Sequence, residues 1–297
     1  MAVNKVYIVC DIEGVAGVVF YEHRHPGMSP LNHEVLKRNR LLMTEEVNAA
    51  VSGAYEAGAE SVIIHDHHGA GYNIVPELFD PRAELIHGRN EQGYAYGLFH
   101  PDLDESIDAL MVLGMHAKAG TVRGGTPHSM IHVKTGAGKE YRLSEAANSM
   151  AYAGGLGVPS VFISGDAACV EDARIHGPWI GSNITKKHYA SQLARTVSPA
   201  VSRERIRAGA ADALGNIARM KPFVIEGACT VQVSDRNPDA RWPEEPVEYP
   251  DFRTALLNTM TSLPWYKPVL EIDDGWRYPD RTHPSGTPGD EWNKSNF

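Results

Sequence analysis

Four short apolar runs, separated by stretches with helical periodicity, constrain the fold of this chain more than any other feature. The runs are Val6–Cys10, Ser61–Ile64, Ala109–Leu113 and Ser160–Ile163. Each is continuous rather than alternating and rich in β-branched residues, as are the strands of a parallel sheet that helices cover on both faces. Strands of this kind alternating with helices predict an α/β fold with a doubly wound, mostly parallel sheet.

Helix signals lie between these runs. Arg40–Ala57 carries apolar residues at roughly helical spacing and is followed by Gly58, a common stop signal. A second helix should begin after Ser144, whose hydroxyl can cap it, and end at the pair Gly154-Gly155. These helices would connect and cover the predicted strands.

The pattern changes after about residue 190. Ala194–Ala218 has a helical pattern, with Pro199 in a first turn or at a break, Cys229–Val233 alternates like a strand, and Phe252–Leu263 fits an amphipathic helix. We therefore expect a large α/β catalytic domain over 1–190 and a smaller α+β domain over 191–272 that supplies substrate or oligomer contacts. A polar C-terminal tail should follow over 273–297.

Charge and apolar run length argue against several kinds of partner. The net charge of −9 disfavours nucleic acid, which would favour a basic surface. The run Val6–Cys10 is too short for a signal peptide, and no segment reaches the ~20 apolar residues of a membrane span. The cysteines, Cys10, Cys169 and Cys229, form no C-x-x-C pair, so no thiolate zinc site is indicated. We expect a cytoplasmic protein without a membrane partner.

Polar residues with metal-binding side chains follow three of the predicted strands directly. Asp11 and Glu13 follow the first strand, and residues two apart on an extended chain point the same way. The second strand leads into a run of acid and imidazole side chains that ends in His68, and the third leads into His116. Open α/β sheets bind their ligands at the carboxyl ends of the strands. This mixture of carboxylates and imidazoles therefore predicts a site for zinc or a similar divalent ion.

Three residues elsewhere are further candidates. Glu145 would lie in the first turn of its helix, where it either complements the helix dipole or supplies the extra carboxylate that two metals ~3.5–4 Å apart require. His128 lies in the flexible stretch 124–130 and either presents an imidazole to a substrate or turns a corner. Asp166 ends the fourth strand and is a candidate partner for the metal ligands. The histidines that we expect in a surface loop, solvated rather than part of a lid, are His23, His25 and His33.

Five short motifs occur in a fixed order between about Lys5 and Ala200. They are Asp11-Ile12-Glu13-Gly14, His65-Asp66-His67-His68, Gly114-Met115-His116-Ala117, Pro127-His128-Ser129-Met130 and Ser144-Glu145. Together they resemble the zinc-dependent D-aminopeptidases of the dipeptide-transport-operon type. Each motif is short, but five in order with similar spacing make the match specific.

The resemblance implies a Rossmann-like domain that holds two Zn²⁺ per chain. The ligands that it implies are Asp11 as the bridge, Glu13 with His116 at one metal, and His68 with Glu145 at the other. It also implies that His128 is the catalytic residue beside the metals. Members of the family release N-terminal D-amino acids from short peptides and assemble into rings, which implies a short peptide or amide substrate and a homo-oligomer. The expected nucleophile is a metal-bound hydroxide, since zinc lowers the pKa of its water from ~15.7 to ~7.

Rival interpretations use the same residues. A dinuclear-metal amidase on a non-peptide substrate and a phosphoesterase would both keep the metal pair, although no Arg/Lys cluster accompanies the ligands as a phosphoesterase would require. A non-catalytic peptide- or metal-binding protein would use the same cleft. A purely structural zinc site is disfavoured because such sites are closed and usually contain Cys. The sequence has no G-x-S-x-G elbow, which argues against a serine hydrolase.

Overall fold

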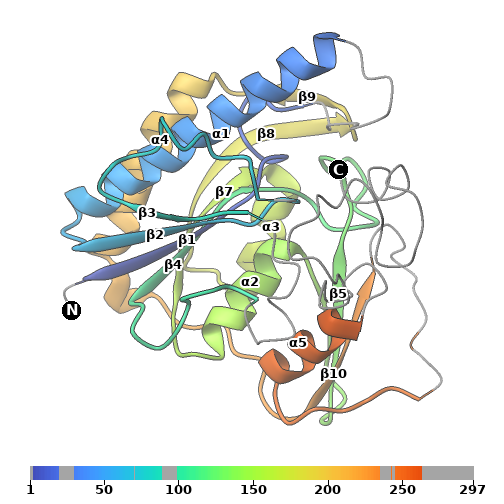
Figure 1. Ribbon diagram of the computed structural model, residues 1–297. Helices are drawn as coiled ribbons and strands as arrows, with labels where there is room; N and C mark the ends of the chain where they lie inside the picture. Colours follow the sequence, from blue (N-terminus) through green and yellow to red (C-terminus); the bar gives the residue numbers. More distant parts are fainter. Residues whose placement is uncertain are drawn as a thin grey trace, which may run out of the picture.

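The computed structural model describes residues 3–19, 30–69, 71–88, 99–234, 242 and 245–262. Its largest element is a seven-stranded sheet with the order β3-β2-β1-β4-β7-β8-β9 (Figure 1). The strands are β1 Lys5–Cys10, β2 Ser61–Asp66, β3 Glu84–Ile86, β4 Ala109–Met115, β7 Ser160–Asp166, β8 Gly181–Ala190 and β9 Leu193–Thr196. All neighbours are parallel except β8 and β9. The predicted mostly parallel α/β sheet is therefore confirmed, and the four predicted strands are its adjacent members β2, β1, β4 and β7.

Helices cover both faces of this sheet. α1 (Pro30–Glu56) and α4 (Pro199–Gly215) pack together on one face. α2 (Glu145–Gly154) and α3 (Ala167–His176) lie on the other, and α5 (Phe252–Ser262) packs against α2 and the strand Cys229–Ser234 (Figure 1). α1 begins ten residues earlier than the predicted helix, at Pro30, a residue that suits a first turn. His33 therefore lies in α1, whereas His23 and His25 lie outside the described residues.

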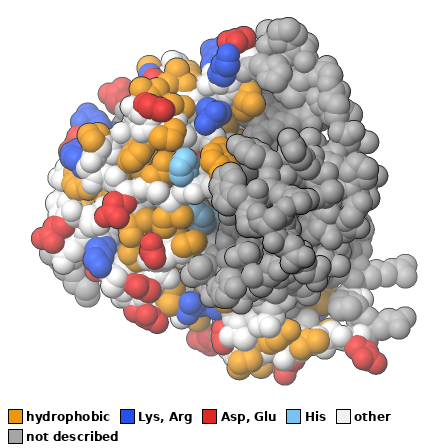
Figure 2. Space-filling model, in the orientation of Figure 1, with side chains coloured by type: hydrophobic (Ala, Val, Ile, Leu, Met, Phe, Trp, Pro, Cys, Tyr) orange, Lys and Arg blue, Asp and Glu red, His pale blue; other side chains and the backbone are white. Residues whose placement is uncertain are grey.

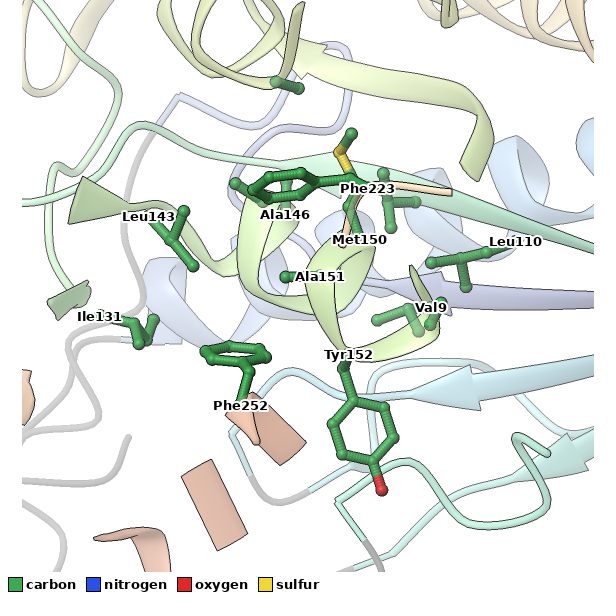
Figure 3. Packing of buried hydrophobic residues seen from close by; sticks show 14 of the residues in the cluster. Val9, Leu110, Ile131, Leu143, Ala146, Met150, Ala151, Tyr152, Phe223 and Phe252 are labelled. Carbon is green, nitrogen blue, oxygen red and sulfur yellow. The ribbon is translucent and has the colours of Figure 1, made fainter. Parts of the chain in front are cut away.

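Side chains that alternate along each strand build two separate hydrophobic cores. Along β1, Val6 and Ile8 face α1 and α4, whereas Tyr7 and Val9 face α2. Figure 3 shows α2 between Val9 and Leu110 of the sheet and Phe252 of α5. Each fully buried aliphatic side chain contributes about 1.5–3 kcal/mol. Burial on both faces explains why the strands are apolar without alternation.

A second, smaller sheet has the order β10-β5-β6 and is antiparallel. Its strands are β5 Met130–Thr135, β6 Glu140–Leu143 and β10 Cys229–Ser234, and a short 3-10 helix covers Ile217–Arg219. The predicted strand at Cys229 and the predicted helix at Phe252 are confirmed. The helix predicted from Ala194 is wrong in its first turns, because Leu193–Thr196 pairs with β8 and α4 begins only at Pro199. The division into domains at residue 190, which falls between β8 and β9, stays a prediction.

The described surface carries mixed charge. In the view of Figure 2, Lys and Arg side chains lie singly or in small groups among acidic and apolar ones. Within the described residues, no helix combines the length and the hydropathy needed to cross a bilayer.

Candidate metal centre

The carboxyl ends of three adjacent strands and the start of one helix bring five candidate ligands to one place. Asp11 and Glu13 follow β1, the central strand of the three, while His68 follows β2 on one side and His116 follows β4 on the other. Glu145 is the first residue of α2, and the Ser144 hydroxyl caps that helix by accepting a hydrogen bond from the Ala147 N–H. The convergence predicted from the strand ends is therefore what the structure shows. Its residues are Asp11, Glu13, His68, His116 and Glu145.

Asp11 lies between the two imidazoles. Its Oδ1 is 2.8 Å from Nδ1 of His68, and its Oδ2 is 3.5 Å from Nε2 of His116. The same His68 atom lies 2.9 Å from Oε2 of Glu13, and the same His116 atom lies 3.4 Å from Oε1 of Glu145. Asp11 thus belongs to two groups of potential donors, one with Glu13 and His68 and one with His116 and Glu145. Glu13 also shares a group with His116, as the resemblance implies, whereas His68 and Glu145, which it implies at the same metal, share no group among the described residues.

The ends of β1 and β4 approach so closely that glycine is required at the contact. The Gly14 N–H donates to the Gly114 carbonyl over 2.7 Å, and the Asp11 N–H donates to the Leu113 carbonyl over 2.9 Å. A Cβ on Gly114 would lie 2.0 Å from the Asp11 carbonyl oxygen, and the φ of +67° at Gly114 is unfavourable for other residues. This contact fixes the backbone on which Asp11 and His116 are mounted.

The donor atoms fit a metal ion better than they fit one another. Asp11, Glu13 and His116 are at most 5 % exposed. Within the described part of the chain, Asp11 Oδ2, both carboxylate oxygens of Glu13, and Nε2 of His116 make no hydrogen bond, although Oε2 of Glu13 lies only 2.9 Å from Nδ1 of His68. Buried polar atoms are normally hydrogen-bonded, because desolvation is otherwise uncompensated. Carboxylate oxygens and imidazole nitrogens are the donors that zinc accepts, and a cation would satisfy all of these atoms.

The pKa values show how strongly the charges interact. Burial raises the pKa of Asp11, and the neighbouring Glu13 carboxylate raises it further. Burial also acts to raise the pKa of Glu13, but His68 and His116 outweigh it and hold that pKa well below its usual value. Burial also acts to raise the pKa of Glu145, but the neighbouring imidazole of His116 lowers it, and the resulting pKa is about 2. Acids packed this closely need nearby positive charge.

Backbone carbonyls orient the imidazoles of His116 and His128. Nδ1 of His116 lies 2.8 Å from the Ala117 carbonyl, and Nδ1 of His128 lies 2.7 Å from the Thr126 carbonyl. Each Nδ1–H therefore donates to a carbonyl, a tautomer assigned from the bonding, and each Nε2 faces the carboxylates. Nε2 of His128 is 3.9 Å from Oε1 of both Glu13 and Glu145. The two rings are stacked, with centroids 4.1 Å apart and planes 6° from parallel.

The loop that carries His128 is held in an unusual backbone conformation. Arg123, Thr126 and Ser129 have φ values of 59°, 37° and 53°. A positive φ is a clear outlier for a β-branched residue such as Thr. Outliers of this kind cluster at functional sites, where the surrounding structure over-determines them.

Two neighbours of His68 have structural roles instead. Asp66 is buried and its Oδ2 accepts hydrogen bonds from the N–H groups of Asn73 and Ile74, at 2.6 and 2.9 Å. His67 packs against His65 and His100, with ring centroids 5.0 and 4.9 Å away. Neither Asp66 nor His67 belongs to the potential donor groups.

Lys186 is a residue of this site that the sequence did not point to. It is 1 % exposed, and its Nζ donates to the carbonyls of Glu13 (2.6 Å), Val15 (2.7 Å) and Val18. Its neighbour Thr185 donates through Oγ1 to the Gly14 carbonyl over 2.5 Å. Burial lowers the pKa of Lys186 to about 8. β8 therefore holds the turn that carries Glu13.

Replacing Lys186 with Met should destabilise the protein by about 3–5 kcal/mol, since it removes the hydrogen bonds that a charged group donates to three buried carbonyls. Urea unfolding of the metal-free protein measures this loss. Lys187→Met is the matched control, because Lys187 is adjacent but exposed. Equal free energies of unfolding for the two variants would contradict the role assigned to Lys186.

Comparisons with known proteins find relatives of this chain. A family model for D-aminopeptidase matches residues 4–241. A D-aminopeptidase of Bacillus subtilis (strain 168) is 28% identical over 220 residues, which cover 74% of this chain and 77% of the relative. Among solved structures, the Zn-dependent D-aminopeptidase DppA from Bacillus subtilis, a self-compartmentalizing protease, aligns with a TM-score of 0.73 at 24% identity. That alignment covers 86% of this chain and 95% of the other. At this identity the structural likeness shows the fold.

Proposed function

This chain belongs to the D-aminopeptidase family, and we propose that it removes N-terminal D-amino acids from short peptides or amides with the help of two zinc ions per chain. Family membership makes the chain a hydrolase of the aminopeptidase type. The observation that carries the metal part of the proposal is the position of Asp11, which faces both His68 and His116 at the strand ends. The similar structure of a zinc-dependent D-aminopeptidase supports zinc as the metal.

The proposed ligands are the five converging residues, with Asp11 shared by both ions. A dinuclear site needs a bridging carboxylate and further acids to balance its charge, and Asp11, Glu13 and Glu145 supply three carboxylates. Asp11, Glu13 and His116 have buried ligand atoms that make no hydrogen bond in the described part of the chain, which is what such a site requires before metal binds. When bound, zinc would lower the pKa of water and polarise the scissile carbonyl.

Substrate would approach the side of the site where side chains reach solvent. The side chains of His68, His128 and Glu145 are 15 %, 19 % and 27 % exposed, whereas Asp11 and Glu13 are buried beneath them. The Thr126 carbonyl holds Nδ1–H of His128, so Nε2 is the nitrogen that faces the substrate. From there it would stabilise the developing oxyanion or pass a proton to the leaving amine.

Metal removal tests this function directly. We expect the purified protein to contain about two zinc ions per chain and to cleave D-aminoacyl amides in preference to their L-counterparts. Chelation should abolish cleavage, and added zinc should restore it. Zinc content is measured by elemental analysis and cleavage by release of the amine. Two metals with cleavage of other amides only would favour a non-peptide amidase, and zinc without any turnover would favour a binding protein.

We also propose that the chain forms a homo-oligomer. The β8–β9 hairpin exposes large apolar side chains, among them Tyr189 at 54 % and Leu193 at 61 %. Such side chains are typical of association surfaces when they lie together, and the structurally similar peptidase is self-compartmentalizing. Size-exclusion chromatography with light scattering should give several times the chain mass of 32.5 kDa. A species of single-chain mass at micromolar concentration would contradict this proposal.

A further inference from the structure

The two stacked imidazoles of the site depend on two carbonyls for their orientation. The Ala117 carbonyl accepts from Nδ1–H of His116, and the Thr126 carbonyl accepts from Nδ1–H of His128. These carbonyls lie on different segments, one after β4 and one in the loop before β5. Parallel rings 4.1 Å apart therefore require that the two segments be fixed relative to each other.

A single buried carboxylate joins these segments. Oδ2 of Asp166 accepts from the Ala117 N–H over 3.2 Å and from the Gly125 N–H over 2.9 Å. The first of these N–H groups is on the residue whose carbonyl orients His116. The second is on the residue directly before Thr126, whose carbonyl orients His128. Asp166 is 1 % exposed, so water does not compete for these bonds.

Helix capping does not account for the whole of this arrangement. Oδ1 of Asp166 caps α3 by accepting from the Cys169 N–H over 2.8 Å. A hydroxyl would serve for that purpose, as Ser144 does for α2. Oδ2 is not used by the cap, and its two partners are 41 and 49 residues away in the sequence.

The surroundings of Asp166 are built for close approach. A Cβ on Gly165 would lie 2.2 Å from the Met115 carbonyl oxygen, so glycine lets the end of β7 reach the end of β4. A Cβ on Gly125 would lie 2.8 Å from Oδ2 of Asp166 and 2.4 Å from Nε2 of His188. Glycine at both positions lets the His128 loop sit directly on the carboxylate.

We propose that Asp166 is a positioning residue that sets His116 and His128 parallel by holding the Ala117 and Gly125 peptides on one oxygen. The proposal rests on the proposed function in that His116 is a metal ligand and His128 acts on the substrate. Partners that orient metal ligands typically change metal affinity or activity by about 10- to 100-fold when they are removed.

Asp166→Ser tests the proposal, because serine keeps the helix cap but cannot reach Ala117 or Gly125. We expect zinc affinity, measured by competition with a chelating dye, and kcat each to fall about 10- to 100-fold, with KM nearly unchanged. Asp251→Ser is the matched control: Asp251 caps α5 through the Thr254 N–H, away from the site, and that variant should behave as wild type. Wild-type zinc affinity and kcat in Asp166→Ser would overturn the proposal and leave Asp166 a helix cap.

Hydrogen–deuterium exchange of the metal-free proteins separates this inference from the proposed function. Asp166→Ser should accelerate exchange at Ala117 and Gly125, and Asp251→Ser should not. If the wild type neither binds zinc nor cleaves amides, the proposed function fails. Faster exchange in Asp166→Ser would still support the positioning role of Asp166, and unchanged exchange would overturn it.

If the serine variant does not fold, Asp166→Asn replaces it. The Asn side chain has a single acceptor oxygen, which cannot both cap α3 and hold the Ala117 and Gly125 peptides. Wild-type exchange, zinc affinity and kcat in Asp166→Asn would therefore overturn the proposal.

Discussion

Asp11→Asn should empty the metal centre of both zinc ions and reduce hydrolysis roughly a thousandfold or more, since the side chain that faces both imidazoles would no longer be a carboxylate. Asn keeps the size of Asp11 and the acceptor of its hydrogen bond from the Ile12 N–H, so the local backbone should not change. Elemental analysis after dialysis measures the zinc. Loss of both ions together is the signature of a bridge, whereas a non-bridging ligand would lose one.

Loss of zinc in this variant should not be a result of unfolding. Burial and Glu13 raise the pKa of Asp11 in the folded, metal-free chain. A carboxyl with a raised folded-state pKa costs stability once the pH is high enough to ionise it, and Asn removes that cost. The metal-free variant should therefore melt no lower than the metal-free wild type at neutral pH.

Asp108→Asn provides the matched control for Asp11→Asn. Oδ2 of Asp108 accepts from the Asn4 and Lys5 N–H groups, at 2.7 and 2.9 Å, beside the start of β1. It lies at the opposite end of the strand that carries Asp11, and its replacement should leave zinc content and activity unchanged. A full complement of zinc in Asp11→Asn would refute the bridge.

Within the large sheet, the strands that could be predicted are those that are apolar on both faces. β1, β2, β4 and β7 stand out because helices cover both sides of the sheet there. β8 was not predicted, because Asn183, Thr185 and Lys186 are buried along it and break the apolar pattern. Those polar side chains bond to the turn after β1 and to α4 rather than to water. The strand is polar because it supports the site.

Most of the candidate ligands could be predicted from the sequence because of the geometry of a parallel sheet. The carboxyl ends of parallel strands lie at one edge of a sheet, so residues that directly follow the adjacent strands β1, β2 and β4 lie close together. Glu145 could be placed in the first turn of a helix because Ser144 marks the start of that helix, but the family resemblance was needed to assign it to a metal. Lys186 could not, since its bond to the Glu13 carbonyl joins residues 173 positions apart and no local pattern encodes it. The same holds for the two partners of Asp166.

His128→Ala should leave about two zinc ions per chain and lower kcat by about 10²–10⁴-fold, the usual contribution of a positioned acid or base. Nε2 of His128 lies 3.9 Å from Glu13 and Glu145, farther than the proposed ligand imidazoles of His68 and His116 lie from their nearest carboxylates. The ring is also partly exposed and its loop backbone is strained at Thr126, which suits a group that meets substrate. Steady-state kinetics with a D-aminoacyl amide and elemental analysis measure the two quantities on the same sample.

His176→Ala is the control for His128→Ala, because the ring of His176 stacks on Phe223, with centroids 4.5 Å apart, as that of His128 stacks on His116. Loss of stacking alone should therefore cost both variants similar stability, and only the His128 variant should lose turnover. Since a ring nitrogen of His128 lies within 4.8 Å of potential ligand atoms of Glu13 and His116, zinc content decides between the two potential roles of His128. If His128→Ala keeps its zinc but loses turnover, His128 is a catalytic residue. If the variant loses both zinc and turnover, His128 is a metal ligand. Wild-type turnover in the variant would exclude both roles.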